Sequence, residues 1–246
     1  MKKILIAVAL VMLLCGACVT SRVKGDAALL LDRGTSFASR QDFDTAIAAY
    51  TEAIRLYRGF TAAYNQRGLA YTYRGDYDKA IKDYTKVIRL EPNPAGAYTS
   101  RGNAYINRGA YAKAVKDFTK VIKIYPNSTP AYYSRGNAYY AKGDYDKAIN
   151  DYTKVISISP DYAAAYYNRG NAYYAKGDYD KAILDDTLVI KIIPDNAVAY
   201  ASRGTAYYNK GNYDKAIEDF TKALELDPNN AIAKQNLENA RNTRGY

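Results

Sequence analysis

Small, aromatic and polar residues follow one another in a pattern that repeats every 34 residues along this chain of 246 residues. Within each 34-residue unit, positions four, eight and eleven are mostly small or aromatic, and so are positions 20, 24 and 27. The spacing i, i+4, i+7 places each of these sets on one face of a helix. The pattern therefore predicts two amphipathic helices in every unit, separated by a turn near its middle.

Six such units follow one another without a gap, which indicates a stack of supersecondary units rather than a globular domain with one central core. Glycine at position eight, such as Gly136, lies inside a predicted helix, where it costs about 1 kcal/mol relative to alanine. Its recurrence indicates a close approach to the alanine at position 20, such as Ala148. The predicted units span residues 27–60, 61–94, 95–128, 129–162, 163–196 and 197–230.

Turn residues agree with this division of the chain. In the fourth unit, Gly143 is expected to end the first helix and Asp144 to cap the second, and Pro160 closes the unit because a helix does not continue through proline. The first unit has Gln41 and Arg58 where the later units have glycine and proline. Such divergence is typical of a terminal repeat, one face of which meets solvent.

One further helix is predicted after the sixth unit, over residues 231–241. Ala233, Leu237 and Ala240 recur on one face of this segment, and the other positions are mostly polar. Residues 231–246 are therefore expected to form a capping helix and tail that cover the exposed end of the last unit.

Taken together, the 34-residue period, an aromatic residue at position four, Gly at eight, Tyr at eleven, Ala at 20, an aromatic residue at 24 and Pro at 32 resemble the tetratricopeptide repeat. The segment NRGNAYYAKGDYDKAI at residues 168–183 lies close to the average sequence of that family. The resemblance implies an all-α fold: a right-handed superhelical solenoid of six helix-turn-helix repeats with a C-terminal capping helix. It also implies that the first helices of the repeats line a concave groove.

Two positions depart from the usual pattern of the family. Position seven is arginine in every unit where the family usually has leucine, and position 23 is aspartate in every unit except the first. We predict a ladder of Arg–Asp pairs, such as Arg135 with Asp151, that packs the two helices of each unit together. The alternative is that both side chains are separately solvated, in which case such pairs contribute little.

The fifth unit has Asp186 at position 24, where every other unit has tyrosine or phenylalanine. An aspartate at a core position weakens the core of this repeat or admits water to it. We interpret it as drift of one repeat away from the common pattern.

The first 17 residues do not follow the repeat and have the pattern of an export signal. A basic start, an apolar run over residues 4–14 and a small-residue end are typical of a secretory signal peptide, and the apolar run is too short to span a bilayer as a helix. The ending Gly16-Ala17-Cys18 resembles the bacterial lipobox, which implies that Cys18 becomes the lipidated first residue of a lipoprotein. Cys15 stands where that motif usually has leucine, and cleavage after Ala17 without lipidation is the alternative.

Residues 18–26 would then link the lipid anchor to the first repeat. Val19, rather than aspartate, follows the cysteine, which in typical double-membraned bacteria implies the outer membrane. We therefore expect an exported lipoprotein on the periplasmic face of that membrane, or a free periplasmic protein if Cys18 carries no lipid.

Catalytic chemistry is not indicated by the composition. The chain has no histidine and no tryptophan, and it contains no phosphate-binding loop, zinc-ligand spacing or nucleophile elbow. We expect no enzyme, no cofactor and no metal site.

The net charge of +10 is concentrated in the second and third units, residues 61–128. A local basic surface attracts anionic lipid headgroups, an acidic partner or nucleic acid, and the export signal argues against nucleic acid. A solvated convex face is an equally good interpretation of the same charges.

Positions five, nine and twelve form a second stripe on each first helix, and in the resembled family this stripe faces the groove. Tyrosine offers a large, stiff contact area with a polar tip, and asparagine offers both a donor and an acceptor. Such a surface suits an extended peptide or a partner helix. The residues are also close to the family average, so an unspecialised groove is the alternative. The predicted partner-binding residues are Asn103, Tyr133, Asn137, Tyr140, Tyr167, Asn171, Tyr174 and Tyr208.

These observations predict a non-enzymatic scaffold for protein–protein interaction in the bacterial cell envelope. An alternative is an accessory module that handles a small ligand for an envelope transport system, which would require a closed, tyrosine-lined cavity or an oligomeric pore. Adhesion through the basic repeats is a third hypothesis, and strong salt sensitivity of binding would favour it.

Overall fold

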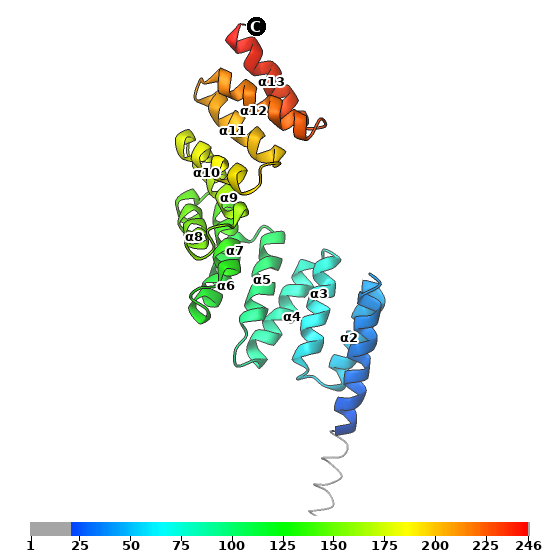
Figure 1. Ribbon diagram of the computed structural model, residues 1–246. Helices are drawn as coiled ribbons and strands as arrows, with labels where there is room; N and C mark the ends of the chain where they lie inside the picture. The colour runs from blue at the N-terminus through cyan, green and yellow to red at the C-terminus, as the bar shows by residue number, and fades with distance from the viewer. Residues whose placement is uncertain (1–20, 246) are drawn as a thin grey trace, which may run out of the picture. The chain divides into compact units, whose positions relative to one another are not determined.

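The computed structural model describes residues 21–245, and every regular element within that range is a helix. The chain divides into two compact units, of which the first ends at Ala110 and the second begins at Tyr111 (Figure 1). A helix over residues 21–38 opens the described part of the chain. The helices that follow are α2 (Phe43–Leu56), α3 (Thr61–Tyr73), α4 (Tyr77–Leu90), α5 (Ala95–Asn107), α6 (Tyr111–Ile124), α7 (Thr129–Ala141), α8 (Tyr145–Ile158), α9 (Ala163–Ala175), α10 (Tyr179–Ile192), α11 (Ala197–Asn209), α12 (Tyr213–Leu226) and α13 (Ala231–Arg244).

Within each of the two compact units, every helix packs against the next one along the chain (Figure 1). In the second compact unit, α7 packs against α8, α8 packs against α9, and the series continues to α13. The first helices of successive repeats also touch, as α7 touches α9. From the second repeat on, each repeat is thus a first helix of 13 residues and a second helix of 14 residues, whereas the first helix of the first repeat is longer. The predicted all-α solenoid of helix-turn-helix repeats is confirmed.

The turns inside the repeats share one backbone feature, a residue with positive φ just before the second helix. Gly143 adopts φ 84°, which glycine accepts without steric cost, and Gln41 adopts φ 63° at the same place in the first repeat. Asp178 caps α10 through a hydrogen bond from the backbone N–H of Lys181, as predicted. Asp144 makes no such cap on α8, so that prediction was wrong for the fourth repeat.

The glycine at position eight makes room for an aromatic ring. A Cβ atom built on Gly136 would lie 2.7 Å from Cε1 of Tyr152, and its nearest neighbours all belong to that ring. The same contact recurs at Gly68, 2.8 Å from Cε1 of Tyr84. In these repeats the ring at position 24, rather than the predicted alanine at position 20, is the nearest neighbour of the glycine. In the fifth repeat, which has no such ring, a Cβ atom on Gly170 would lie 3.6 Å from the carbonyl oxygen of Ala182.

The predicted Arg–Asp ladder is present, and the fourth repeat shows its geometry. Nε and an Nη atom of Arg135 donate to the two carboxylate oxygens of Asp151 over 2.8 and 2.7 Å, and the Asp151 side chain is buried. Charge-assisted bidentate pairs of this kind are directional and strong for their size. The same geometry recurs in Arg67–Asp83, Arg169–Asp185 and Arg203–Asp219.

Each ladder arginine also reaches back to the preceding repeat. The remaining Nη atom of Arg135 donates to Oγ1 of Thr119 on α6 over 3.1 Å, and its guanidinium lies between the rings of Tyr132 and Tyr139. Arg101 makes the same contact with Thr85 over 2.8 Å. One side chain therefore joins three helices. Threonine occupies the position of Thr119 in all six repeats, and this recurrence is the sequence signal for the contact with the arginine.

The C-terminal helix covers the end of the sixth repeat. Leu237, Ala233 and Ala240 on α13 are buried in one cluster with Phe220 of α12, as expected for a capping helix. At the other end, residues 21–26, which were expected to be a linker, are helical and continue into the first repeat. The predicted signal peptide and Cys18 lie outside the described residues. Across residues 21–245 no helix is long and apolar enough to cross a bilayer.

Candidate functional site

Side chains of three helices meet in a hydrogen-bonded cluster within the fourth and fifth repeats. Nδ2 of Asn168 on α9 donates to the hydroxyl of Tyr133 over 2.9 Å and to Oδ1 of Asn137 over 3.0 Å, both on α7. The hydroxyl of Tyr152 on α8 donates to the same Oδ1 atom over 2.8 Å. Asn137 is thus held by two donors, and its carbonyl oxygen has a set direction.

A small cavity of about 140 Å³ opens beside this cluster. Its lining combines three amide side chains with two tyrosines. The lining residues are Asn137, Tyr140, Tyr152, Asn168 and Asn171. Two predicted site residues from α7 and one from α9 therefore lie around one space.

Aromatic rings support the same cluster from behind. The Tyr133 ring lies edge-on to Tyr162 with centroids 5.3 Å apart, and tilted to Tyr152 with centroids 6.0 Å apart. Burial, and then the neighbouring Tyr162, raise the pKa of Tyr133, and burial raises the pKa of Tyr152 as well. Both hydroxyls therefore keep their protons at neutral pH and remain hydrogen-bond donors.

The tyrosines at position twelve are held by the next helix along the chain. Tyr140, Tyr174 and Tyr208 each contact the tyrosine that begins the following helix, with ring centroids 5.4 Å apart. Nδ2 of Asn209 also donates to the Tyr174 hydroxyl over 2.8 Å. These side chains thus have limited freedom before any partner arrives, which lowers the entropy cost of binding.

Not all predicted residues come together. Tyr133, Asn137, Tyr140, Tyr167, Asn171 and Tyr174 lie on the paired first helices α7 and α9, and we call this set the tyrosine–asparagine surface. Asn103 is an exposed residue of α5 in the other compact unit. Tyr208 lies on α11 with its hydroxyl 3.3 Å from Oγ1 of Thr243 on the capping helix. Their use by a partner stays a prediction.

Asn168 and Asn209, which are not among the predicted site residues, hold the tyrosines of the surface in place. Each is bonded to a tyrosine 35 residues earlier, as Asn168 is to Tyr133 and Asn209 to Tyr174. The usable signal is therefore an asparagine one position later in the following repeat. It crosses from one repeat to the next and does not show when each repeat is read by itself.

The basic residues of the range 61–128 are divided between the two compact units. Lys113, Lys116, Lys120 and Lys123 are exposed along α6 with a spacing that keeps them on one side of the helix. The remaining basic residues of the range 61–128 belong to the first compact unit. Contact with an anionic surface stays a prediction.

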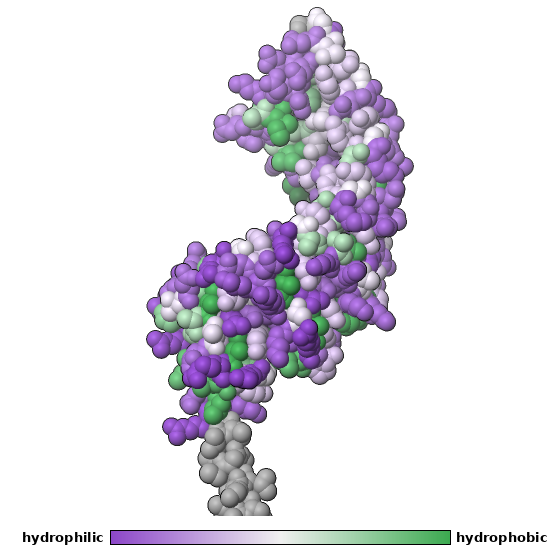
Figure 2. Space-filling view, turned by 180° about the vertical axis from the view of Figure 1, so that it is seen from behind, coloured by the Kyte–Doolittle hydropathy of each residue, from purple (hydrophilic) through white to green (hydrophobic). Residues whose placement is uncertain are grey.

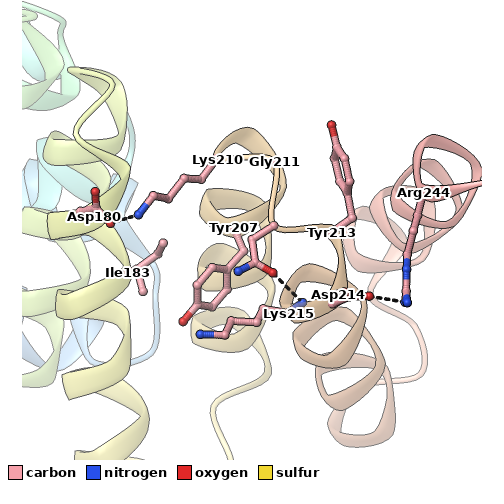
Figure 3. A pocket seen from close by; sticks show the side chains of 10 residues that line it. Asp180, Ile183, Tyr207, Lys210, Gly211, Tyr213, Asp214, Lys215 and Arg244 are labelled. Carbon is pink, nitrogen blue, oxygen red and sulfur yellow. Dashed lines mark hydrogen bonds and ion pairs between the residues drawn. The ribbon is translucent and has the colours of Figure 1, made fainter.

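A larger hollow of about 550 Å³ lies beside the turns of the fifth and sixth repeats (Figure 3). Lys210 reaches back to Asp180, and Arg244 reaches back to Asp214, each over a span of 30 residues. Arg108 and Asp78 make the equivalent pair in the first unit, at 2.9 Å. Exposed ion pairs contribute about 0–1 kcal/mol each to stability, so these pairs do not mark a built site. We interpret the hollow as the gap between neighbouring turns.

Hydrophobic side chains on the face drawn in Figure 2 gather in small separate groups among hydrophilic residues. Leu184, Ile193 and Val198 are among the exposed apolar residues of the second unit, at 60, 44 and 51%. Scattered apolar residues are normal on a protein surface and do not mark a site by themselves.

Family models of the repeat match most of the chain. A model described as "TPR repeat" matches residues 102–143 and 136–177, and one described as "Tetratricopeptide repeat" matches residues 61–94, 163–196 and 197–230. A third, with the latter description, matches residues 31–72. The chain belongs to the tetratricopeptide repeat family. Proteins of this fold are scaffolds for protein–protein interaction, and nothing in the matches indicates catalysis.

Solved structures of other tetratricopeptide repeat proteins are similar to this one. A crystal structure of MamA is 34% identical, with a TM-score of 0.63, over 67% of this chain and 96% of that chain. A tetratricopeptide repeat protein from Parabacteroides merdae is 26% identical, with a TM-score of 0.62, over 87% of this chain and 84% of that one. YrrB, described as having an unusual peptide-binding site, is 22% identical over 76% of this chain and 96% of that one, with a TM-score of 0.63, and shows the fold alone. No curated protein matches the chain.

Proposed function

We propose that this tetratricopeptide repeat protein is an envelope scaffold that binds a peptide segment or a partner helix across its tyrosine–asparagine surface. The observation that supports the proposal most is the cluster in which Asn168 holds Tyr133 and Asn137. Rigid aromatic side chains with a polar tip are the groups on which binding energy concentrates in protein interfaces. Here they are fixed in place beforehand, so a partner would not have to order them.

The cavity size favours a protein partner over the alternative of a small-ligand module. Sites that enclose a small molecule usually have volumes of about 300–1,000 Å³. The cavity beside Asn137 has about 140 Å³, which suits a single inserted side chain rather than a whole ligand.

Placement in the envelope rests on the leader and on Cys18. Lipidation at Cys18 would hold the first repeat close to the bilayer, since few residues separate them. Replacing Cys18→Ser should move the protein from the membrane fraction to the soluble periplasmic fraction. Retention of the variant in the membrane fraction would contradict the anchor.

The binding proposal is tested by affinity capture from membranes of the native organism. The amount of captured partner should fall about tenfold or more in a fourfold variant, because several contact residues at the centre of an interface are removed together. The variant is Tyr133→Ala/Asn137→Ala/Tyr167→Ala/Asn171→Ala. Tyr73→Ala is the matched control, since Tyr73 is 68% exposed on α3, outside the surface. Unchanged helicity by circular dichroism shows that both variants fold. An unchanged partner list for the fourfold variant would refute the proposal.

A further inference from the structure

The fifth repeat lacks the aromatic ring that fills the same place in the others. Phe220 covers Gly204 in the sixth repeat, where an added Cβ atom would lie 2.9 Å from a ring carbon. In the fifth repeat the nearest atoms to a Cβ on Gly170 are Cβ of Asp185 at 3.3 Å and Oδ1 of Asp186 at 3.5 Å. The carboxyl group of Asp186 therefore points into the space that a ring would occupy.

That space is a cavity of about 110 Å³ among α9, α10 and α11. It has room for more than one water molecule, each of which occupies about 30 Å³ in the liquid. Asp186 is only 3% exposed, and among the described residues its Oδ1 atom has no hydrogen-bond partner. A buried carboxyl oxygen without a donor is costly, which points to a missing ligand or solvent. The lining residues are Gly170, Asn171, Tyr174, Asp186, Ser202 and Thr205.

The fourth repeat shows what the fifth has lost. There Asn137 accepts from two donors, the hydroxyl of Tyr152 and the amide of Asn168. The equivalent residues one repeat later are Asn171, Asp186 and Ser202. The tyrosine hydroxyl that donates to Asn137 in the fourth repeat is thus replaced by the carboxyl group of Asp186, and the amide of Asn168 by the shorter hydroxyl of Ser202.

The surrounding charges leave Asp186 without a counter-ion. The charges that act on it belong to Asp185 on its own helix, Arg203 on α11 and Asp219 on α12. Arg203 is bonded to Asp219 over 2.8 Å, and Arg169 on α9 is bonded to Asp185 over 2.7 Å. Both arginines are therefore already paired within the ladder. Burial, and then the charge of Asp185, raise the pKa of Asp186 to about 8.

We propose that this cavity binds a primary ammonium group on an alkyl chain, and that its natural occupant is a lysine side chain of the peptide partner. An ammonium group is a compact cation with three donors and no acceptor, which matches a space lined by the Asp186 carboxyl group, the Asn171 amide oxygen and the Ser202 hydroxyl. The cation would bind Asp186 in its ionised form. Asn171 and Tyr174 belong both to the cavity and to the tyrosine–asparagine surface, so a bound peptide would lie beside its mouth. The natural occupant rests on the proposed function; the ammonium site does not.

The test is a titration of the isotope-labelled full chain with n-butylammonium chloride, monitored by backbone amide shifts in nuclear magnetic resonance spectra. Saturable shifts are expected at Asn171 and Ser202, and n-butanol, which has the same shape without the charge, should produce none that saturate. The variant Asp186→Asn should bind about tenfold more weakly, because a charge-assisted hydrogen bond is lost.

A second variant keeps the result interpretable. Asp186→Tyr restores the residue that Tyr152 represents in the fourth repeat, fills the cavity and should abolish the shifts while the rest of the spectrum is retained. Binding to the wild-type chain should also tighten as pH rises from 6 to about 8, because the cation binds the ionised carboxylate.

Three results would overturn the ammonium site: no saturable shifts in the wild-type chain, equal binding of butanol, or undiminished binding by Asp186→Tyr. The cavity would then be a hydrated gap left by drift of one repeat. Because this titration needs no partner protein, its failure is independent of the affinity capture. Loss of a partner by a Tyr133→Ala/Asn137→Ala variant, which leaves Asn171 and the cavity intact, still tests the proposed function.

Discussion

At the scale of single residues, the most informative position is 24 of the repeat. Tyr152 is 1% exposed and packs onto Gly136, so the ring and the glycine form a packing pair in which neither residue can be enlarged. In the fifth repeat Asp186 replaces the ring of this packing pair, while the glycine, Gly170, remains. The result is a space with a buried acid inside it, where the other repeats have hydrocarbon.

This acid should make stability depend on pH. The pKa of Asp186 is about 8 in the folded chain, above the value of about 3.9 in an unfolded chain. A raised pKa means that its contribution is fully present below pH 4 and is lost as pH rises to 8. The unfolding free energy of the wild type, relative to Asp186→Asn, should therefore fall by up to about 1.4 kcal/mol per pH unit across that window.

Urea unfolding of both proteins between pH 4 and 9 measures this difference. The neutral asparagine is the matched control because it keeps the shape and does not titrate. Parallel curves for the two proteins across the window would show that Asp186 is ionised in the folded chain throughout.

At the scale of elements, the arginine at position seven decides how three helices are joined. Arg135 bonds Asp151 on the second helix of its own repeat and Thr119 on the second helix of the preceding one. Because neighbouring repeats supply all the contacts of a solenoid, such a junction couples the stability of one repeat to the next.

Replacing Arg135→Leu, the usual residue of the family, should destabilise the protein by about 3 kcal/mol, because it leaves the Asp151 carboxylate buried without a counter-ion. Adding Asp151→Leu should recover most of the loss, since two apolar side chains can pack where the pair stood. Thermal unfolding followed by circular dichroism compares the three proteins. Equal melting temperatures for the wild type and Arg135→Leu would mean that the pair contributes nothing.

At the scale of the whole molecule, a stack of repeats has ends that must be covered. The capping helix α13 does this at the C-terminal end, where Leu237 stands at the position that arginine occupies in the six repeats. The apolar side chain of Leu237 joins the cluster that contains Phe220.

The variant Leu237→Asp should lower stability by about 2–4 kcal/mol and promote self-association, because it puts a charge against that buried cluster and exposes its end. Lys234→Asp, at an exposed position of the same helix, is the control and should change stability by less than about 0.5 kcal/mol. Light scattering and thermal unfolding measure both effects. An unaltered, monomeric Leu237→Asp protein would show that the helix is not needed as a cap.

The sequence by itself determined the helices, their order and the family, because a 34-residue period imposes the same helix pair six times. It also predicted the Arg–Asp pairs, since co-occurrence within one repeat reflects contact within one repeat. The tyrosines and asparagines at positions five, nine and twelve could be chosen from the same periodicity, and their binding role stays a prediction.

Only the tertiary structure decided the contacts that cross between repeats. Thr119 with Arg135, and Asn168 with Tyr133, join side chains that belong to different units of the pattern. The structure likewise showed that Gly136 faces a ring rather than an alanine, and that Asp186 is buried beside an unfilled space. Periodicity specifies which face of a helix turns inward. The distances between packed helices, and so which atoms meet and where space remains, follow only from packing all the side chains together.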